Sequence, residues 1–123
     1  MKARPRPAGP IESALVKACL DLLAVRRIFA WRNSVGAAYN PRGRFVRFGK
    51  VGSSDILGVL PGGRLLALEV KRPGGRLTEA QADFLQQINT AGGLAVMIQD
   101  VETLERLLPQ EARGGRREGP ACP

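Results

Sequence analysis

The chain has 123 residues, a net charge of +8 and no histidine. Its length is that of one ordinary domain, with enough residues to bury a core without disulfides or a structural metal. The absence of histidine excludes Ser-His and Cys-His catalytic systems and the commonest zinc sites, so a bound metal would need oxygen ligands. No apolar run approaches the ~20 residues of a membrane span. No secretory signal begins the chain, so we expect a cytoplasmic protein with no membrane partner.

Basic residues are concentrated in the middle of the chain. Between residues 26 and 76, eleven Lys and Arg residues stand against only two acids, Asp55 and Glu69. From residue 77 to 109 the balance reverses, with five acids and one base. Clustered cations bind phosphates and release their counterions, so we interpret the middle segment as a nucleic-acid surface. A generally basic surface that keeps the protein in solution is the alternative.

The first third of the chain predicts an arm, a helix, a strand and a hairpin. Residues 1–10 are rich in proline and basic residues, which is typical of a flexible arm. Residues 11–27 carry apolar side chains at helical spacing, and Glu12 extends that inward stripe near the helix start. A negative charge there also stabilises the helix by interacting with its positive N-terminal end, so this simpler explanation of Glu12 stays open. Residues 28–35 predict a strand, and residues 37–48 predict a hairpin.

The predicted hairpin combines one tyrosine with four cations. Tyr39, Arg42, Arg44, Arg47 and Lys50 lie within twelve residues of one another. Phosphates take up the charge of such cations and bases stack on aromatic rings, so this composition suits nucleic acid. Charged residues that guard the exposed edge of a hairpin are the alternative explanation.

The second half of the chain predicts a central pair of strands, a helix, a strand and a short helix. Residues 55–60 and 64–71 are apolar on both faces, as in covered central strands, and Pro-Gly-Gly joins them. A second helix begins at Thr78, where Gln81 fits a capping box and also extends an inward stripe. A strand over 94–98 and a helix over 100–108 follow, and residues 110–123 have the composition of a disordered tail. The order α-β-β-β-β-β-α-β-α predicts one α/β domain over residues 11–109, with helices packed on a mixed central sheet.

Asp55 and Glu69 are costly to place at the ends of apolar strands. In a hairpin they lie opposite each other, with β-carbons ~4.5–5.5 Å apart. Two carboxylates this close repel, so one takes up a proton or a divalent cation lies between them. Lys71 is on the same face, ~6.5 Å further along its strand. The three side chains suit metal-assisted phosphodiester hydrolysis, with the lysine as electrostatic partner; a salt-bridged sheet end is the alternative.

Asp55 followed by Glu69-Val70-Lys71 resembles the core of the PD-(D/E)XK nucleases. Three further features make residues 11–100 similar to the VRR-NUC (virus-type replication-repair nuclease) domain. They are an acid early in the first helix, the run Gly-Ser-Ser-Asp that ends at Asp55, and the run Leu-Thr-Glu-Ala-Gln that ends at Gln81. Ser54 stands where the wider superfamily has its naming proline.

The resemblance implies a restriction-endonuclease-like fold and a DNA endonuclease that depends on Mg²⁺ or Mn²⁺. It implies that Asp55, Glu69 and the carbonyl of Val70 hold the metal, with Glu12 as a further candidate ligand. Lys71 and Gln81 are then catalytic residues, as are the acids. Small stand-alone members, often phage-encoded, resemble junction resolvases and tend to be homodimers, so we expect structure-selective cleavage by a dimer.

We expect six basic residues to contact DNA phosphates: Arg42, Arg44, Arg47, Lys50, Arg72 and Arg76. Two other functions remain as alternatives at this point. One is a DNA-binding module without catalysis, which the intact set of site residues argues against. The other is an RNA endonuclease, which the sequence does not distinguish well from a DNA endonuclease.

Overall fold

The computed structural model describes residues 9–109 of the chain. The order of its elements is the predicted one, with three helices and six strands among the described residues. These are α1 (Pro10–Val25), β1 (Phe29–Arg32), β2 (Gly36–Tyr39), β3 (Phe45–Phe48), β4 (Ile56–Val59), β5 (Leu65–Val70), α2 (Glu79–Thr90), β6 (Leu94–Ile98) and α3 (Val101–Leu107). The predicted tail and all but the last two residues of the predicted arm lie outside the described residues, and Pro10 already begins α1.

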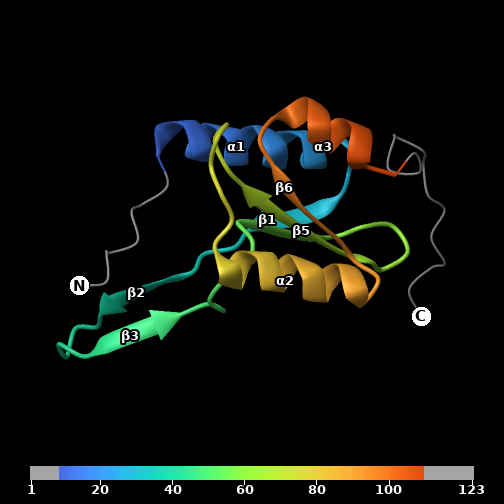
Figure 1. The fold of residues 1–123 in the computed structure, drawn as a ribbon. Helices are drawn as coiled ribbons and strands as arrows, with labels where there is room; N and C mark the ends of the chain where they lie inside the picture. Colours follow the sequence, from blue (N-terminus) through green and yellow to red (C-terminus); the bar gives the residue numbers. More distant parts are fainter. Residues whose placement is uncertain (1–8, 110–123) are drawn as a thin grey trace.

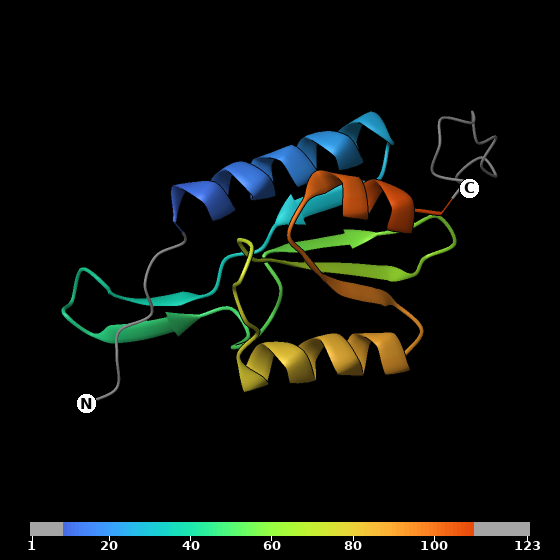
Figure 2. The ribbon, with the colours of Figure 1, turned by 45° about the horizontal axis from the view of Figure 1, so that its top comes forward.

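A mixed four-stranded sheet forms the centre of the domain. Its strands lie in the order β1-β4-β5-β6, with β1, β4 and β5 antiparallel and β6 parallel to β5. Helices α1 and α3 lie together on one face of this sheet and α2 lies on the other (Figures 1 and 2). The α/β class and the flanking helices are therefore as predicted.

The core explains why these segments pack as they do. The apolar stripe of α1, with Val16, Cys19 and Leu23, is buried against Ile56 and Leu68 of the sheet. On the opposite face a smaller cluster joins the sheet to the apolar side of α2 through Ala67, Ala95 and Leu85. Both faces of β5 are covered, so its residues from Leu66 to Val70 are all buried. The buried central strand carries the candidate site at its end.

Strands β2 and β3 form a separate two-stranded sheet, the β2–β3 hairpin, which projects from the body next to the start of α2 (Figures 1 and 2). The prediction of a hairpin over 37–48 is confirmed, but it does not join the central sheet. Every residue of β3 is exposed, and only Gly36 and Asn40 are partly covered in the segment from β2 through the turn. Because its side chains bury little area against the body, nothing draws the hairpin into the core.

In the described part of the chain, no helix has both the length and the apolar composition needed to cross a membrane.

Candidate active site

Asp55, directly before β4, and Glu69, near the end of β5, lie at the same end of the central sheet. The antiparallel register pairs Ile56 with Leu68, so one further step places Asp55 opposite Glu69. The main-chain N–H of Val70 donates to Oδ2 of Asp55 at 2.8 Å, which fixes the aspartate against β5. The alignment expected from the Pro-Gly-Gly turn is therefore confirmed.

Glu69 is a buried acid with an unsatisfied oxygen. The residue is 3% exposed, and its Oε2 has no hydrogen-bond partner among the described residues. Burial above all, and then the charge of Asp55, raise the pKa of Glu69 from 4.5 to about 8. The nearby Lys71 ammonium acts in the opposite direction. Glu69 therefore keeps its proton at neutral pH when no cation lies beside it.

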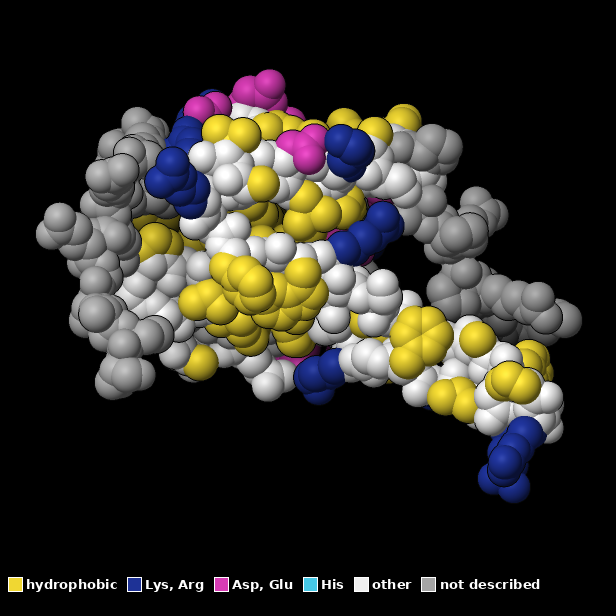
Figure 3. Space-filling view, turned by 180° about the vertical axis from the view of Figure 1, so that it is seen from behind, with side chains coloured by type: hydrophobic (Ala, Val, Ile, Leu, Met, Phe, Trp, Pro, Cys, Tyr) yellow, Lys and Arg dark blue, Asp and Glu magenta, His cyan; other side chains and the backbone are white. Residues whose placement is uncertain are grey.

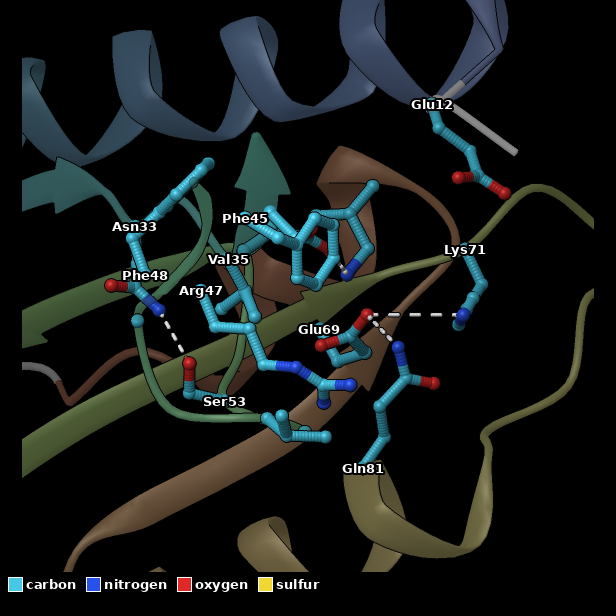
Figure 4. Close-up of a pocket in the computed structure, with 17 residues that line it drawn as sticks. Glu12, Asn33, Val35, Phe45, Arg47, Phe48, Ser53, Glu69, Lys71 and Gln81 are labelled. Carbon is cyan, nitrogen blue, oxygen red and sulfur yellow. Dashed lines mark hydrogen bonds and ion pairs between the residues drawn. The ribbon is translucent and has the colours of Figure 1, made fainter. Parts of the chain in front are cut away.

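Lys71 and Gln81 both contact the same oxygen of Glu69. The Lys71 Nζ lies 3.8 Å from Glu69 Oε1, and the Gln81 Nε2 donates to it at 3.0 Å. Figure 4 shows these two side chains converging on Glu69 from the segment directly after β5 and from the start of α2. The lysine and the glutamine of the predicted set are therefore brought to the glutamate.

Gln81 also caps α2, so both explanations of this residue apply. Its Oε1 accepts from the main-chain N–H of Thr78, and its own N–H donates to Thr78 Oγ1. Because the cap uses the amide oxygen, the amide nitrogen is the end that faces Glu69. Gln81 can therefore donate a hydrogen bond in the site but has no free oxygen there to accept one.

Glu12 lies on the wall of the pocket, apart from the other acids. Its Oε1 accepts from the N–H of Arg72 at 3.5 Å, which ties the start of α1 to the segment after β5. Residues 9–109 contain no group of three or more Asp, Glu, Cys or His side chains close enough together to hold a metal ion. The structure therefore does not bring Glu12 into one cluster with Asp55 and Glu69.

The loop before Asp55 is held in place by Gly52 and Asn33. Gly52 has a φ of 84°, and a β-carbon there would lie 2.5 Å from the carbonyl oxygen of Ala80 in α2. The amide of Asn33 donates to Ser53 Oγ at 2.7 Å and to the Ser54 carbonyl at 3.0 Å, and its N–H donates to the Asp55 carbonyl at 2.7 Å. The sequence analysis includes Gly52 in the run that ends at Asp55. It missed Asn33, which lies within the predicted strand over 28–35, directly after the observed end of β1, and carries no recognisable motif.

A cavity of about 580 Å³ opens over the acids. Besides the site residues it is lined by Asn33, Phe45, Arg47, Phe48 and Ser53, as the close-up in Figure 4 shows. Of the six bases expected to bind DNA, only Arg47 lines this cavity. The other five do not line it and are exposed: Arg42, Arg44, Lys50, Arg72 and Arg76. Of the six predicted phosphate contacts, Arg47 therefore lies in the cavity with the acids, and the other five lie outside the cavity.

A family profile for the VRR-NUC domain matches residues 17–101. The match covers more than half of the chain and contains Asp55, Glu69, Lys71 and Gln81. The chain belongs to the VRR-NUC family. Glu12 precedes the matched segment, so this match carries no support for a role of Glu12 in the site. No curated protein and no solved structure matches the chain.

VRR-NUC proteins are nucleases, and the donor set here fits a hard divalent cation. Mg²⁺ and Mn²⁺ prefer carboxylate and carbonyl oxygens. Among residues 9–109, the buried Oε2 of Glu69 has no hydrogen-bond partner, and the register of β4 and β5 places Asp55 opposite Glu69. A cation would satisfy the orphaned oxygen and remove the repulsion between the two acids.

Proposed function

We propose that the chain is a Mg²⁺- or Mn²⁺-dependent endonuclease that hydrolyses phosphodiester bonds in DNA. The observation that carries this proposal is the pair of facing acids at the open end of a buried strand, with one buried oxygen of Glu69 that has no hydrogen-bond partner in the described part of the chain. Membership of the VRR-NUC family supports nuclease activity. The basic middle segment supports a polyanionic substrate.

Asp55 and Glu69 are the proposed metal ligands, with the carbonyl of Val70 beside them. The Val70 N–H donates to Asp55, so Val70 would orient one ligand with its N–H and supply another with its carbonyl oxygen. A divalent cation bound there would polarise the phosphate and lower the pKa of a water molecule. The protein's part is to hold the two acids rigidly opposite each other.

Lys71 is the proposed electrostatic partner of the reacting phosphate. Its ammonium lies 3.8 Å from Glu69 Oε1 at the edge of the cavity, where charge develops on the phosphate oxygens. Gln81 holds Glu69 through its amide nitrogen and is proposed to orient a water molecule or a phosphate oxygen from the same side. Glu12 faces the cavity from α1 and is proposed to bind a water molecule at its rim or to contribute a further ligand.

The phosphate contacts are proposed to run from the cavity outward along both flanks. Arg47 lies in the cavity, while Arg42 and Arg44 lie at the far turn of the β2–β3 hairpin. Lys50 follows the hairpin, and Arg72 and Arg76 lie in the exposed segment between β5 and α2. Cations in these places would bind the phosphates of a strand that enters the cavity. A cleavage assay with junction, flap and plain-strand DNA measures which structure is preferred.

A cleavage assay tests the proposed function. The purified protein is incubated with single-stranded, duplex, flapped and four-way DNA, and with RNA of the same sequence, in Mg²⁺, Mn²⁺ or EDTA. We expect cleavage of at least one DNA in either metal, none in EDTA, and none by Asp55→Ala. Cleavage that persists in EDTA, or that is unchanged in Asp55→Ala, would contradict the mechanism. Cleavage of RNA alone would replace the proposed substrate.

We also propose that the protein acts as a homodimer, as the family resemblance implies for small stand-alone nucleases. A dimer would present two sites to the two strands of a junction. Light scattering on the purified protein measures its mass in solution. A monomer at high concentration would argue against symmetric cleavage of two strands.

A further inference from the structure

One face of the β2–β3 hairpin carries a continuous row of two rings and a cation. The antiparallel register pairs Ala37 with Arg47 and Tyr39 with Phe45, so these four residues share a face. The rings of Tyr39 and Phe45 meet edge to face with their centroids 5.5 Å apart. The guanidinium carbon of Arg47 lies 5.9 Å from the centre of the Phe45 ring. The side chains therefore contact one another in the order Tyr39, Phe45, Arg47.

This row leads into the candidate active site. Phe45 and Arg47 line the same cavity as Asp55 and Glu69, and Tyr39 lies one contact further out along the hairpin. Figure 4 shows Phe45 and Arg47 reaching into the cavity from β3. A ligand that lies along the rings would therefore have its next unit at the acids.

The two rings remain open in the folded chain. Tyr39 is 74% exposed and Phe45 is 55% exposed, even though they contact each other. Figure 3 shows the hairpin extending from the body with hydrophobic side chains along it and basic side chains at its end. Exposed aromatic rings in a two-stranded sheet add nothing to a core, and such a hairpin is only marginally stable on its own. A ligand that covers the rings would remove apolar surface from water and would stabilise the hairpin.

The neighbouring charges identify the kind of ligand. Arg42 and Arg44 lie at the turn beyond Tyr39, and Arg47 lies beyond Phe45, so cations stand at both ends of the row. A second copy of the hairpin would bring like charges together, whereas a polyanion would neutralise them. Stacking also requires an open base face, and in a duplex each base is covered by its neighbours. Rings between cations therefore suit unpaired nucleotides.

We propose that Tyr39 and Phe45 form a stacking site for the unpaired bases of single-stranded DNA, next to the active site. This inference rests on the proposed function for its choice of nucleic acid and for the role of the acids. Bases stack on the two rings while Arg47 binds the phosphate between Phe45 and the acids. The next phosphate along the strand is then the one presented to Asp55, Glu69 and Lys71. The enzyme therefore selects DNA whose bases are unpaired beside the cleaved bond.

Fluorescence of 2-aminopurine tests the stacking site without cleavage. A single-stranded oligonucleotide that carries the probe is titrated with the protein in EDTA, alone and annealed to its complement. Stacking on the rings quenches the probe, so we expect quenching and tighter binding for the single strand than for the duplex. Tyr39→Ala and Phe45→Ala are each expected to weaken binding of the single strand by about fivefold or more, which is the lower end of the range for a base–aromatic stack.

Two kinds of variant separate stacking from folding. Phe45→Tyr keeps a ring and is expected to restore both the quenching and the affinity, whereas a purely structural role for the exact side chain would not be rescued. Phe29→Ala is the matched control, because Phe29 is 72% exposed and pairs with Trp31 at 5.4 Å but does not line the cavity. It is expected to bind the single strand as the unaltered protein does.

The inference is overturned if duplex binds as tightly as single strand, if Phe45→Ala binds normally, or if Phe29→Ala weakens binding equally. Cleavage of the same DNAs in Mg²⁺ is measured separately. Cleavage without stacking would leave the proposed function standing and remove the stacking site. Stacking without cleavage of any of these DNAs would leave the stacking site standing and remove the proposed nuclease function.

Discussion

The two sheets of this protein use similar residues for different purposes. Strand β5 is buried from Leu66 to Val70, and the acids and lysine stand at its end. Strand β3 has Phe and Val residues that are all exposed, with arginines between and beside them. The central sheet therefore supplies a rigid position for chemistry, whereas the hairpin supplies a surface. We expect substitutions in the body to change catalysis or folding, and substitutions in the hairpin to change binding alone.

Replacing Lys71 by glutamine should reduce catalysis strongly without removing the proposed metal ligands. The substitution keeps a polar side chain that is one atom shorter and removes the charge near the reacting phosphate. The expected loss in kcat is about 100- to 1,000-fold, with little change in the affinity for DNA measured in EDTA. Lys17→Gln is the control, because Lys17 is exposed on α1 and pairs with Asp21. Equal losses for both variants would show that net charge matters and position does not.

Replacing Leu68 by alanine should destabilise the fold far more than any change in the hairpin. Leu68 is fully buried in the middle of β5, so the expected cost is about 2–5 kcal/mol of unfolding free energy. Val46→Ala is the partner experiment in β3, where the side chain is exposed and the expected cost is within about 0.5 kcal/mol. Denaturant unfolding measures both. Similar costs would mean that the hairpin is part of the cooperative core.

Replacing Glu69 by glutamine should stabilise the metal-free protein at neutral and mildly alkaline pH. The pKa of Glu69 is raised to about 8 in the folded protein, above its ordinary 4.5. Between pH 4.5 and 8 the folded state thus holds a proton that the unfolded state has lost. The free energy of unfolding of the unaltered protein therefore falls as the pH rises through this range. The slope of one proton is at most about 1.4 kcal/mol per pH unit.

The measurement is thermal unfolding of both proteins in EDTA between pH 5 and pH 9. The advantage of Glu69→Gln should grow across this window and then level off, while its cleavage of DNA should be lost. A constant difference between the two proteins would show that Glu69 is not protonated in the folded state.

Replacing Arg42 by glutamine should give the smallest effect, confined to binding. One lost phosphate contact reduces the slope of log affinity against log salt by about 0.7 to 0.9. Arg64→Gln is the control, because Arg64 lies at the other end of the central sheet and donates to the Gly92 carbonyl. Its slope should equal that of the unaltered protein. An unchanged slope for Arg42→Gln would remove the hairpin turn from the proposed DNA path.

Much of the fold could be predicted from the sequence because apolar periodicity and turn residues specify it locally. The Pro-Gly-Gly turn set the register that places Asp55 opposite Glu69, and covered strands were visible as apolar runs. The isolation of the β2–β3 hairpin could not be predicted, because it depends on which surfaces compete for the core. Its alternating pattern is equally compatible with an edge of the central sheet.

The site was predictable where a charged residue stands in an apolar strand, because such a residue has few structural roles there. Acids at strand ends and a lysine two residues on were identified, and Gln81 was identified with its cap as an open alternative. Asn33 escaped notice because asparagine is common at strand ends, and its contact to Ser53 spans twenty residues of sequence. Long-range polar contacts of this kind leave no periodic trace in the chain. The separation of Glu12 from the other two acids likewise depends on how α1 packs.

Metal binding measured by calorimetry tests the central claim most directly. Mn²⁺ is titrated into the protein at pH 7 in two buffers that differ in ionisation enthalpy, so that protons released on binding are counted. We predict saturable binding with release of close to one proton, as Glu69 gives up the proton that its raised pKa retains. Asp55→Asn, which can still accept from the Val70 N–H, should bind far more weakly. Absence of Mn²⁺ binding, or binding that Asp55→Asn leaves unchanged, would contradict a metal-dependent nuclease site at these acids.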